Sequence, residues 1–94
     1  MLHVSTRGQA PTLRFADALL AGLARDGGLY WPDTIPTLDL STIANFAGRS
    51  YADVAEKVIG SFTADAIEPK ALRRMIDEAY GTFRHRAVCP LVQL

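Results

Sequence analysis

The sequence predicts a small α+β domain that is mainly helical, with three to four helices and a short two-stranded sheet formed by the chain ends. Apolar residues recur at helical spacing over much of the region between residues 15 and 83. Both ends of the chain consist of β-prone residues. Since 94 residues hold one small domain and no more, we expect residues 1–94 to form a single domain.

The two ends are expected to pair with each other. Residues 2–6 alternate apolar and polar side chains, which is typical of a short half-buried strand. Residues 7–11 contain Gly8 and a proline and therefore predict a loop. Residues 87–93 are apolar and β-prone. Because an isolated strand leaves backbone groups unsatisfied, we expect 2–6 and 87–93 to form the sheet, with Pro90 at a bulge or facing outward.

The first helix is expected to follow the loop. One face carries apolar or small residues at helical spacing, and we expect this face to be buried: Phe15, Ala18, Leu19, Gly22 and Leu23. Arg14 is a poor N-cap, so Thr12 is the expected capping residue. Gly27 and Gly28 are expected to close the helix.

Local signals delimit three further helices. Asp39 or Ser41 caps a short helix that ends near Gly48. A variant capping box of Ser50 and Asp53 opens the next helix. Proline at the favoured first position opens the last helix, which is expected to stop or bend near a glycine: Pro69 and Gly81. Between the first two helices, prolines keep residues 29–38 extended or looping.

Composition excludes several classes of protein. Ten basic and ten acidic side chains give a formal charge of zero, which argues against a nucleic-acid partner and a polybasic membrane anchor. Apolar runs are far shorter than the ~20 residues needed to span a bilayer, so no membrane partner is expected. No secretion signal is visible, and the lone Cys89 fits a reducing compartment. We therefore expect a cytoplasmic protein.

The metal-ligating and nucleophilic candidates are sparse. His85 and Cys89 lie four residues apart, but the only other histidine or cysteine is His3, and a metal site needs three or four ligands. No third group suggests an oriented triad in which His85 serves as the base for Cys89. We therefore expect a structural histidine, a buried thiol and no metal.

Three other features favour ordinary structural roles. Gly27-Gly28 lacks the flanking pattern of a phosphate-binding loop. Residues 84–86, Arg-His-Arg, form a small basic cluster that is typical of a solvated surface. Lys57 and Lys70 are expected to face water, since neither lies in a motif that would make it a cofactor-binding lysine.

Residues Ser5, Thr6 and Arg7 form the candidate binding site for an anion. They offer two hydroxyl groups and a forked guanidinium, followed by Gly8, which lets backbone N–H groups converge. This chemistry suits a phosphate or a carboxylate. The alternative is a strand end followed by a turn, in which the same hydroxyls serve the local backbone.

Four blocks together resemble the amino-terminal segment of threonine synthases. They are STRGQAP at 5–11, LLAGLARDGGLYWP at 19–32, YADVA at 51–55 and FRHRAVCPL at 83–91. The resemblance covers nearly the whole chain. Arg14 stands where a capping serine is expected, and Trp31 stands where an aliphatic residue is commoner.

The resemblance implies a pyridoxal-phosphate enzyme that converts O-phospho-L-homoserine and water to L-threonine and phosphate. In this family the cofactor is held by a lysine in an HGPTxAFKD-like segment, which is absent from these 94 residues. The resemblance therefore assigns no catalytic or cofactor-binding residue here. It implies a domain that packs on a C-terminal catalytic body, and we expect the chain to be cut from a longer one and to be inactive alone.

A self-contained helical interaction module is the rival interpretation. Nearly half of the residues are hydrophobic, and a domain this small cannot cover them all. The excess is expected around Leu29, Tyr30 and Trp31 and around the apolar residues between 88 and 94. Either interpretation therefore predicts an apolar surface for a partner. If the chain is cut from a longer one, we also expect the isolated chain to self-associate.

Overall fold

A three-stranded antiparallel sheet occupies the amino-terminal third of the chain. The computed structural model describes residues 1–94. Strand β1 (Leu2–Ser5) lies between β2 (Leu13–Arg14) and β3 (Tyr30–Pro32). In the register, Leu2 faces Arg14 and Val4 faces Trp31. Together with four helices, this sheet confirms the α+β class.

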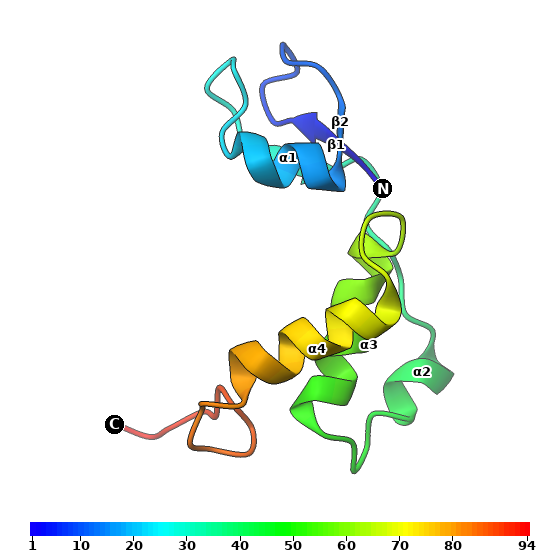
Figure 1. Ribbon diagram of the computed structural model, residues 1–94, viewed down its shortest axis with the longest axis vertical. Helices are drawn as coiled ribbons and strands as arrows, with labels where there is room; N and C mark the ends of the chain where they lie inside the picture. Colours follow the sequence, from blue (N-terminus) through cyan, green and yellow to red (C-terminus); the bar gives the residue numbers. More distant parts are fainter.

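The prediction that the chain ends form the sheet is wrong. Residues 87–94 contain no strand, and the two termini lie well apart (Figure 1). Both edges of β1 are already occupied, because β2 and β3 pair with it on either side. The segment Tyr30–Pro32, which was expected to be extended or looping, is extended and supplies the partner strand that 87–93 was expected to supply.

Helix α1 (Phe15–Ala21) covers one face of the sheet. His3 and Ser5 point toward it and are buried, and the rings of His3 and Phe15 lie 6.0 Å apart at 55°. The helix has Arg14 at its N-cap without a side-chain hydrogen bond, so the expected cap by Thr12 is wrong. Strand β2 runs directly into α1, which leaves no turn in which Thr12 could cap.

The end and the buried face of α1 also differ from expectation. Gly22, with φ of +69°, closes the helix, and its N–H donates to the Ala18 carbonyl; Gly27 and Gly28 lie in a later turn. Ala18 is buried, whereas Leu19 and Leu23 are 67% and 66% exposed. The helix packs on the sheet through a small side chain, and these leucines stay uncovered.

The other three helices form a second group. They are α2 (Leu40–Ala44), α3 (Tyr51–Thr63) and α4 (Pro69–Tyr80). Their predicted starts are confirmed, although α2 ends at Ala44 rather than near Gly48. The Asp39 carboxylate accepts the Thr42 N–H at 2.7 Å.

The capping box at the start of α3 and the proline at the start of α4 are also present. Ser50 Oγ accepts the Asp53 N–H at 3.1 Å, while the Asp53 carboxylate accepts the Ser50 N–H at 3.3 Å. Helices α3 and α4 pack on each other around Thr63, Leu72 and Ile76, which are the buried residues of this pair. No helix has the length and apolar character that crossing a membrane requires.

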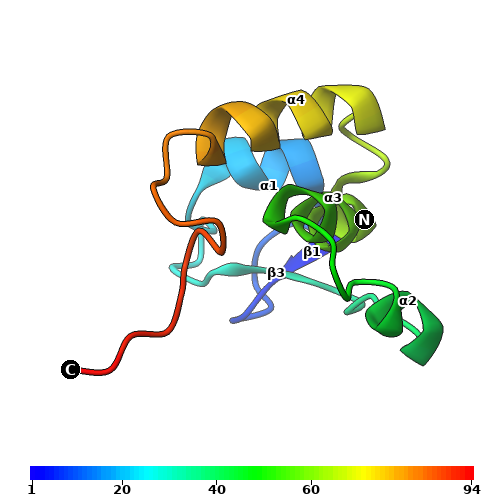
Figure 2. The same ribbon diagram turned by 90° about the horizontal axis from the view of Figure 1, so that it is seen from below.

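The chain is spread over two groups of elements rather than around a common core. Figure 1 shows the sheet with α1 apart from α2–α4, and Figure 2 shows residues 81–94 leading away from the helices. The groups are joined by residues 33–38 and by an ion pair between the Met1 ammonium and the Asp65 carboxylate. Only 8 of 94 residues are buried. The radius of gyration is 15.8 Å, against about 12 Å for a compact domain of this length.

Candidate functional site

The three predicted site residues converge on one turn. Ser5, at the end of β1, donates its hydroxyl to the Asp26 carboxylate, with Oγ at 2.7 and 2.8 Å from the two oxygens. Thr6 Oγ1 accepts the Leu29 N–H at 3.0 Å. Arg7 Nη1 donates to the Asp26 carbonyl oxygen at 3.0 Å. All three side chains therefore bind the segment 26–29.

Asp26 is the centre of this arrangement. Besides the Ser5 hydroxyl, its carboxylate accepts the N–H groups of Gly28 and Gln9, each at 2.9 Å. The Ser5 hydrogen bond, followed by these backbone hydrogen bonds, holds the pKa of Asp26 below its ordinary value against the opposing effect of burial. We call this set the Asp26 clamp: Ser5, Thr6, Arg7, Asp26 and Gly28.

Close approach in the clamp requires glycine at two positions. A Cβ on Gly28 would collide with Ser5 Oγ and would lie 3.0 Å from both Thr6 Oγ1 and Asp26 Oδ1. A Cβ on Gly27 would lie 2.6 Å from Arg7 Nη1, and its φ is +82°. The turn at Gly27 and Gly28 can therefore approach residues 5–7 this closely because neither glycine has a side chain.

Sequence reasoning missed Asp26 as part of the site. The Asp-Gly-Gly pattern does carry a local signal, since aspartate commonly accepts the N–H two residues on, as Asp26 does from Gly28. The hydrogen bond to Ser5 spans 21 residues and has no such signal. A local pattern could therefore have found the turn but not its partner.

The clamp leaves part of Arg7 available. The guanidinium is exposed and takes part in no salt bridge, and its one bond is to a carbonyl oxygen rather than to a carboxylate. The hydroxyls of Ser5 and Thr6 are engaged in the turn. Any anion bound here would therefore meet the Arg7 guanidinium first.

A cavity of about 750 Å³ is bordered by α2, α3 and the start of α4, and it does not fit a phosphate-bearing cofactor. Three carboxylates line it, from Asp39, Asp53 and Glu56, and Lys57 is its only cation. Negative charge at this ratio opposes a phosphate group. The second lysine of the chain, Lys70, is exposed on α4. This cavity therefore provides no cradle for pyridoxal phosphate.

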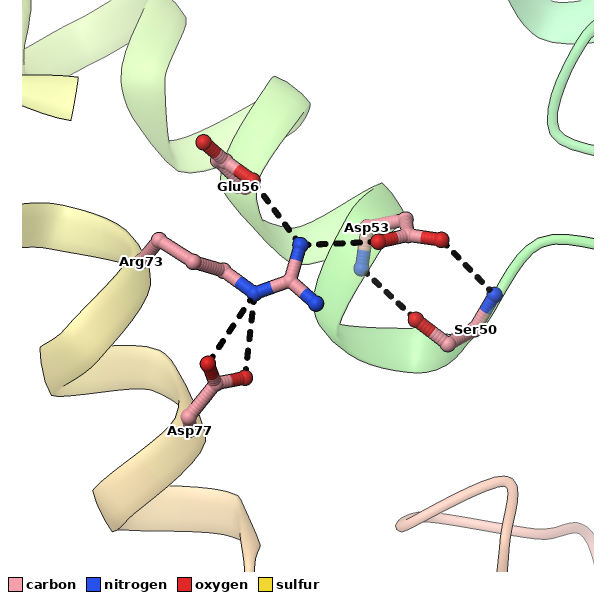
Figure 3. Close-up of polar contacts among 5 residues, drawn as sticks. All are labelled: Ser50, Asp53, Glu56, Arg73 and Asp77. Carbon is pink, nitrogen blue, oxygen red and sulfur yellow. Dashed lines mark hydrogen bonds and ion pairs between the residues drawn. The ribbon is translucent and has the colours of Figure 1, made fainter. Parts of the chain in front are cut away.

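Beside this cavity, one arginine joins α3 to α4 (Figure 3). Arg73 Nη1 donates to Asp53 at 2.7 Å and to Glu56 at 3.0 Å, while Nε donates to both oxygens of Asp77, at 3.0 and 3.2 Å. Arg73 lowers the pKa of Asp53, and the carboxylates, Asp53 first, raise the pKa of Arg73. All four groups are used within the helix pair, so this cluster is structural.

The carboxyl-terminal candidates lie on the surface. Cys89 is exposed, so the expected buried thiol is wrong; the segment that carries it forms no strand and is not covered by the helices. His85 Nδ1 accepts the Ala87 N–H at 3.0 Å. No group of three histidine, cysteine or acidic side chains is placed to hold a metal ion. Residues 84–86 are exposed, as predicted.

Comparison with known proteins identifies the family. Residues 2–80 match the family model described as threonine synthase N terminus. The chain therefore belongs to the threonine synthase N-terminal family. It is 48% identical, over its whole length, to threonine synthase from Pseudomonas aeruginosa, and 40% identical to human threonine synthase-like 2. It spans about 20% of the length of each of these relatives.

Solved structures show the same fold. The chain is similar to a pyridoxal-phosphate-bound threonine synthase from Brucella melitensis, with 57% identity and a TM-score of 0.92. That match covers 99% of this chain and 20% of the other. A yeast threonine synthase matches with 36% identity and a TM-score of 0.85, covering 95% of this chain and 18% of the other. The fold described above is thus the fold of this region in those enzymes.

Proposed function

We propose that this chain serves as the amino-terminal domain of a pyridoxal-phosphate-dependent threonine synthase. The reaction would convert O-phospho-L-homoserine and water to L-threonine and phosphate. The observation that carries the proposal is the match of 99% of the chain, at 57% identity, to 20% of a cofactor-bound threonine synthase. The Pseudomonas relative bears the same name and is 48% identical.

The domain's role is to pack on a catalytic body. The small number of buried residues and the radius of gyration of 15.8 Å support this role, because a self-contained module of this length would be more compact. Lys57 and Lys70 are exposed and have no cofactor cradle around them. The cofactor and its lysine therefore belong to the catalytic body, and the 94 residues alone are inactive. The lone cysteine supports a cytoplasmic setting.

Within the domain, Arg7 is the proposed contact to the anionic substrate, with Ser5 and Thr6 as supporting groups. The support is geometric: the Arg7 guanidinium is exposed and free of any salt bridge. Its bond to the Asp26 carbonyl, together with the Ser5 and Thr6 contacts to the same turn, limits where it can point. A guanidinium held in this way is suited to a phosphate or carboxylate group.

Replacing Arg7 by alanine in the complete enzyme tests the role of this residue. Loss of one charge-assisted hydrogen bond is expected to cost about 1.5–3 kcal/mol of binding free energy, which lowers kcat/KM roughly 10- to 150-fold. The melting temperature should stay near that of the parent. Arg25→Ala is the control, since Arg25 is exposed and makes no ion pair. Normal kinetics with a lowered melting temperature would make Arg7 purely structural.

The function itself is tested by producing the complete polypeptide. With added pyridoxal phosphate it should release phosphate from O-phospho-L-homoserine and form an equal amount of threonine. The 94-residue chain assayed in parallel should do neither. A reading frame that stops after Leu94, or a complete polypeptide without this activity, would favour the self-contained interaction module instead.

A further inference from the structure

One face of the sheet carries a row of exposed apolar side chains. Helix α1 covers the side to which His3 and Ser5 point, so Leu2 and Val4 point to the opposite side. The facing residue of Val4 is Trp31, and directly paired residues share a side. The alternation thus defines an outer side of the sheet that no helix covers.

The row continues beyond the three strands. Leu29 precedes Trp31 by two residues in extended chain and therefore shares its side. An isolated antiparallel bridge joins Leu29 to Leu23, which places Leu23 next in the row. We call these residues the outer sheet face: Leu2, Val4, Leu23, Leu29 and Trp31. Their exposed fractions are 45%, 36%, 66%, 60% and 58%, in that order.

Arg14 pairs with Leu2 at one edge of this side. The rest of the face has the reverse of the composition of a sheet face that meets water. Antiparallel sheets with one solvated side normally place polar residues there. The outer sheet face exposes roughly 300–500 Å² of side-chain surface, as large as the largest apolar patches of soluble monomers. Its central tryptophan is a residue type enriched at the energetic centres of interfaces. A surface of this kind indicates a docking site.

We propose that the outer sheet face docks onto an apolar surface of the catalytic body that follows this segment in its relatives. The proposal rests on the proposed function and adds to it which face of the domain makes the contact. Four-fifths of the length of the matched relatives lies outside the region that this chain matches. A partner in the same polypeptide is therefore the occupant that the comparisons favour.

The size of the outer sheet face also favours the catalytic body over a second copy of the chain as its partner. Two outer sheet faces together would bury about 600–1,000 Å², less than the roughly 1,200–2,000 Å² of stable interfaces. A body in the same polypeptide is held at an effective concentration in the millimolar range, so a smaller contact suffices. The face is thus too small for a lasting dimer but large enough for a tethered neighbour.

Cysteine labelling of the complete polypeptide tests the proposal. In a Cys89→Ser background, Leu23→Cys and Leu29→Cys are introduced singly, and Glu78→Cys on the exposed side of α4 is the control. Reaction with a small maleimide is followed at each position by mass spectrometry. We expect the two outer-face cysteines to react at least tenfold more slowly than the control under native conditions, and all three equally in denaturant.

Rates within twofold of the control would overturn the proposal. Protection that is lost on dilution would also overturn it, because it would assign the face to a second copy. If a cysteine variant fails to fold, hydroxyl-radical oxidation of Trp31 in the unaltered polypeptide is measured instead. Slow oxidation of Trp31 is expected, and rapid oxidation would contradict the proposal. Phosphate release from O-phospho-L-homoserine is measured on the same samples. An active enzyme whose outer-face cysteines react as fast as the control refutes only the docking. An inactive polypeptide whose outer-face cysteines are protected refutes only the proposed function.

Discussion

At the scale of single residues, one carboxylate organises the amino-terminal third of the chain. Asp26 accepts hydrogen bonds from the end of β1, from the loop at Gln9 and from its own turn. The sequence alone left two interpretations of Ser5 and Thr6 open. Both hydroxyls form hydrogen bonds to the turn at residues 26–29. Ser5 and Thr6 therefore have a structural role that does not depend on what the Arg7 guanidinium contacts.

The depressed pKa of Asp26 predicts a pH-dependent stability. A carboxyl group whose pKa is lowered by folding contributes stability that is present above its unfolded pKa, about 3.9, and is lost as the pH falls through the folded value. Asp26→Asn should therefore lower the melting temperature at pH 7, and this effect should shrink as the pH falls from 7 through the lowered pKa of Asp26. Thermal melts across this range measure the difference.

Asp33→Asn is the matched control for this prediction. The Asp33 side chain is exposed and makes no hydrogen bond or ion pair in the structure. Its replacement should leave the pH profile unchanged. Identical profiles for both variants would show that the Asp26 carboxylate adds no stability in solution.

At the scale of elements, helices α2–α4 and strand β1 could be predicted from the sequence, but the partner strands of β1 could not. The start of α3 is encoded by Ser50 and Asp53, and the start of α4 by Pro69, all within one helical turn. The residues that pair with β1 lie 10 to 29 positions away in the sequence, in strands only two and three residues long. Strands this short carry almost no periodicity, so no pattern distinguished them from residues 87–93.

The packing of α4 on α3 is expected to depend on Ile76. Its side chain is 3% exposed, and Ile76→Ala should cost about 2–4 kcal/mol of unfolding free energy through lost burial and a residual cavity. Met75→Ala on the same helix is the control, since Met75 is 50% exposed, and it should cost less than about 1 kcal/mol. Denaturant titration of both variants measures the difference; equal losses would mean that the helices do not pack as described.

At the scale of the whole molecule, the sequence predicted only in part which apolar residues are buried. The apolar excess was expected at Leu29 and Trp31, and both are exposed. It was not expected at Leu19 on α1 or at Leu23 just beyond the helix, which were assigned to a buried face and are uncovered. Helical periodicity indicates that a face will be covered, but it does not say by what, and here no element of the 94 residues covers it.

The isolated chain is expected to self-associate at high concentration. Its uncovered apolar surface favours association, but the outer sheet face alone is too small for a tight dimer. Analytical ultracentrifugation over a dilution series should show reversible growth in mass, which a separately produced catalytic body should suppress by forming a one-to-one complex. A monomer at every concentration that forms no complex on mixing would mean that the domain is self-contained.

The contact of Gly28 with Ser5 also sets how this region tolerates mutation. Every substitution that a single base change can make in a glycine codon introduces a Cβ, and a Cβ on Gly28 meets three oxygen atoms that are already hydrogen-bonded to one another or to the turn. Gly8 has nothing within 4 Å and requires only a positive φ, which asparagine and aspartate tolerate. In a saturation library, none of the nineteen substitutions at position 28 should therefore preserve the fold. At position 8, a few substitutions should preserve it.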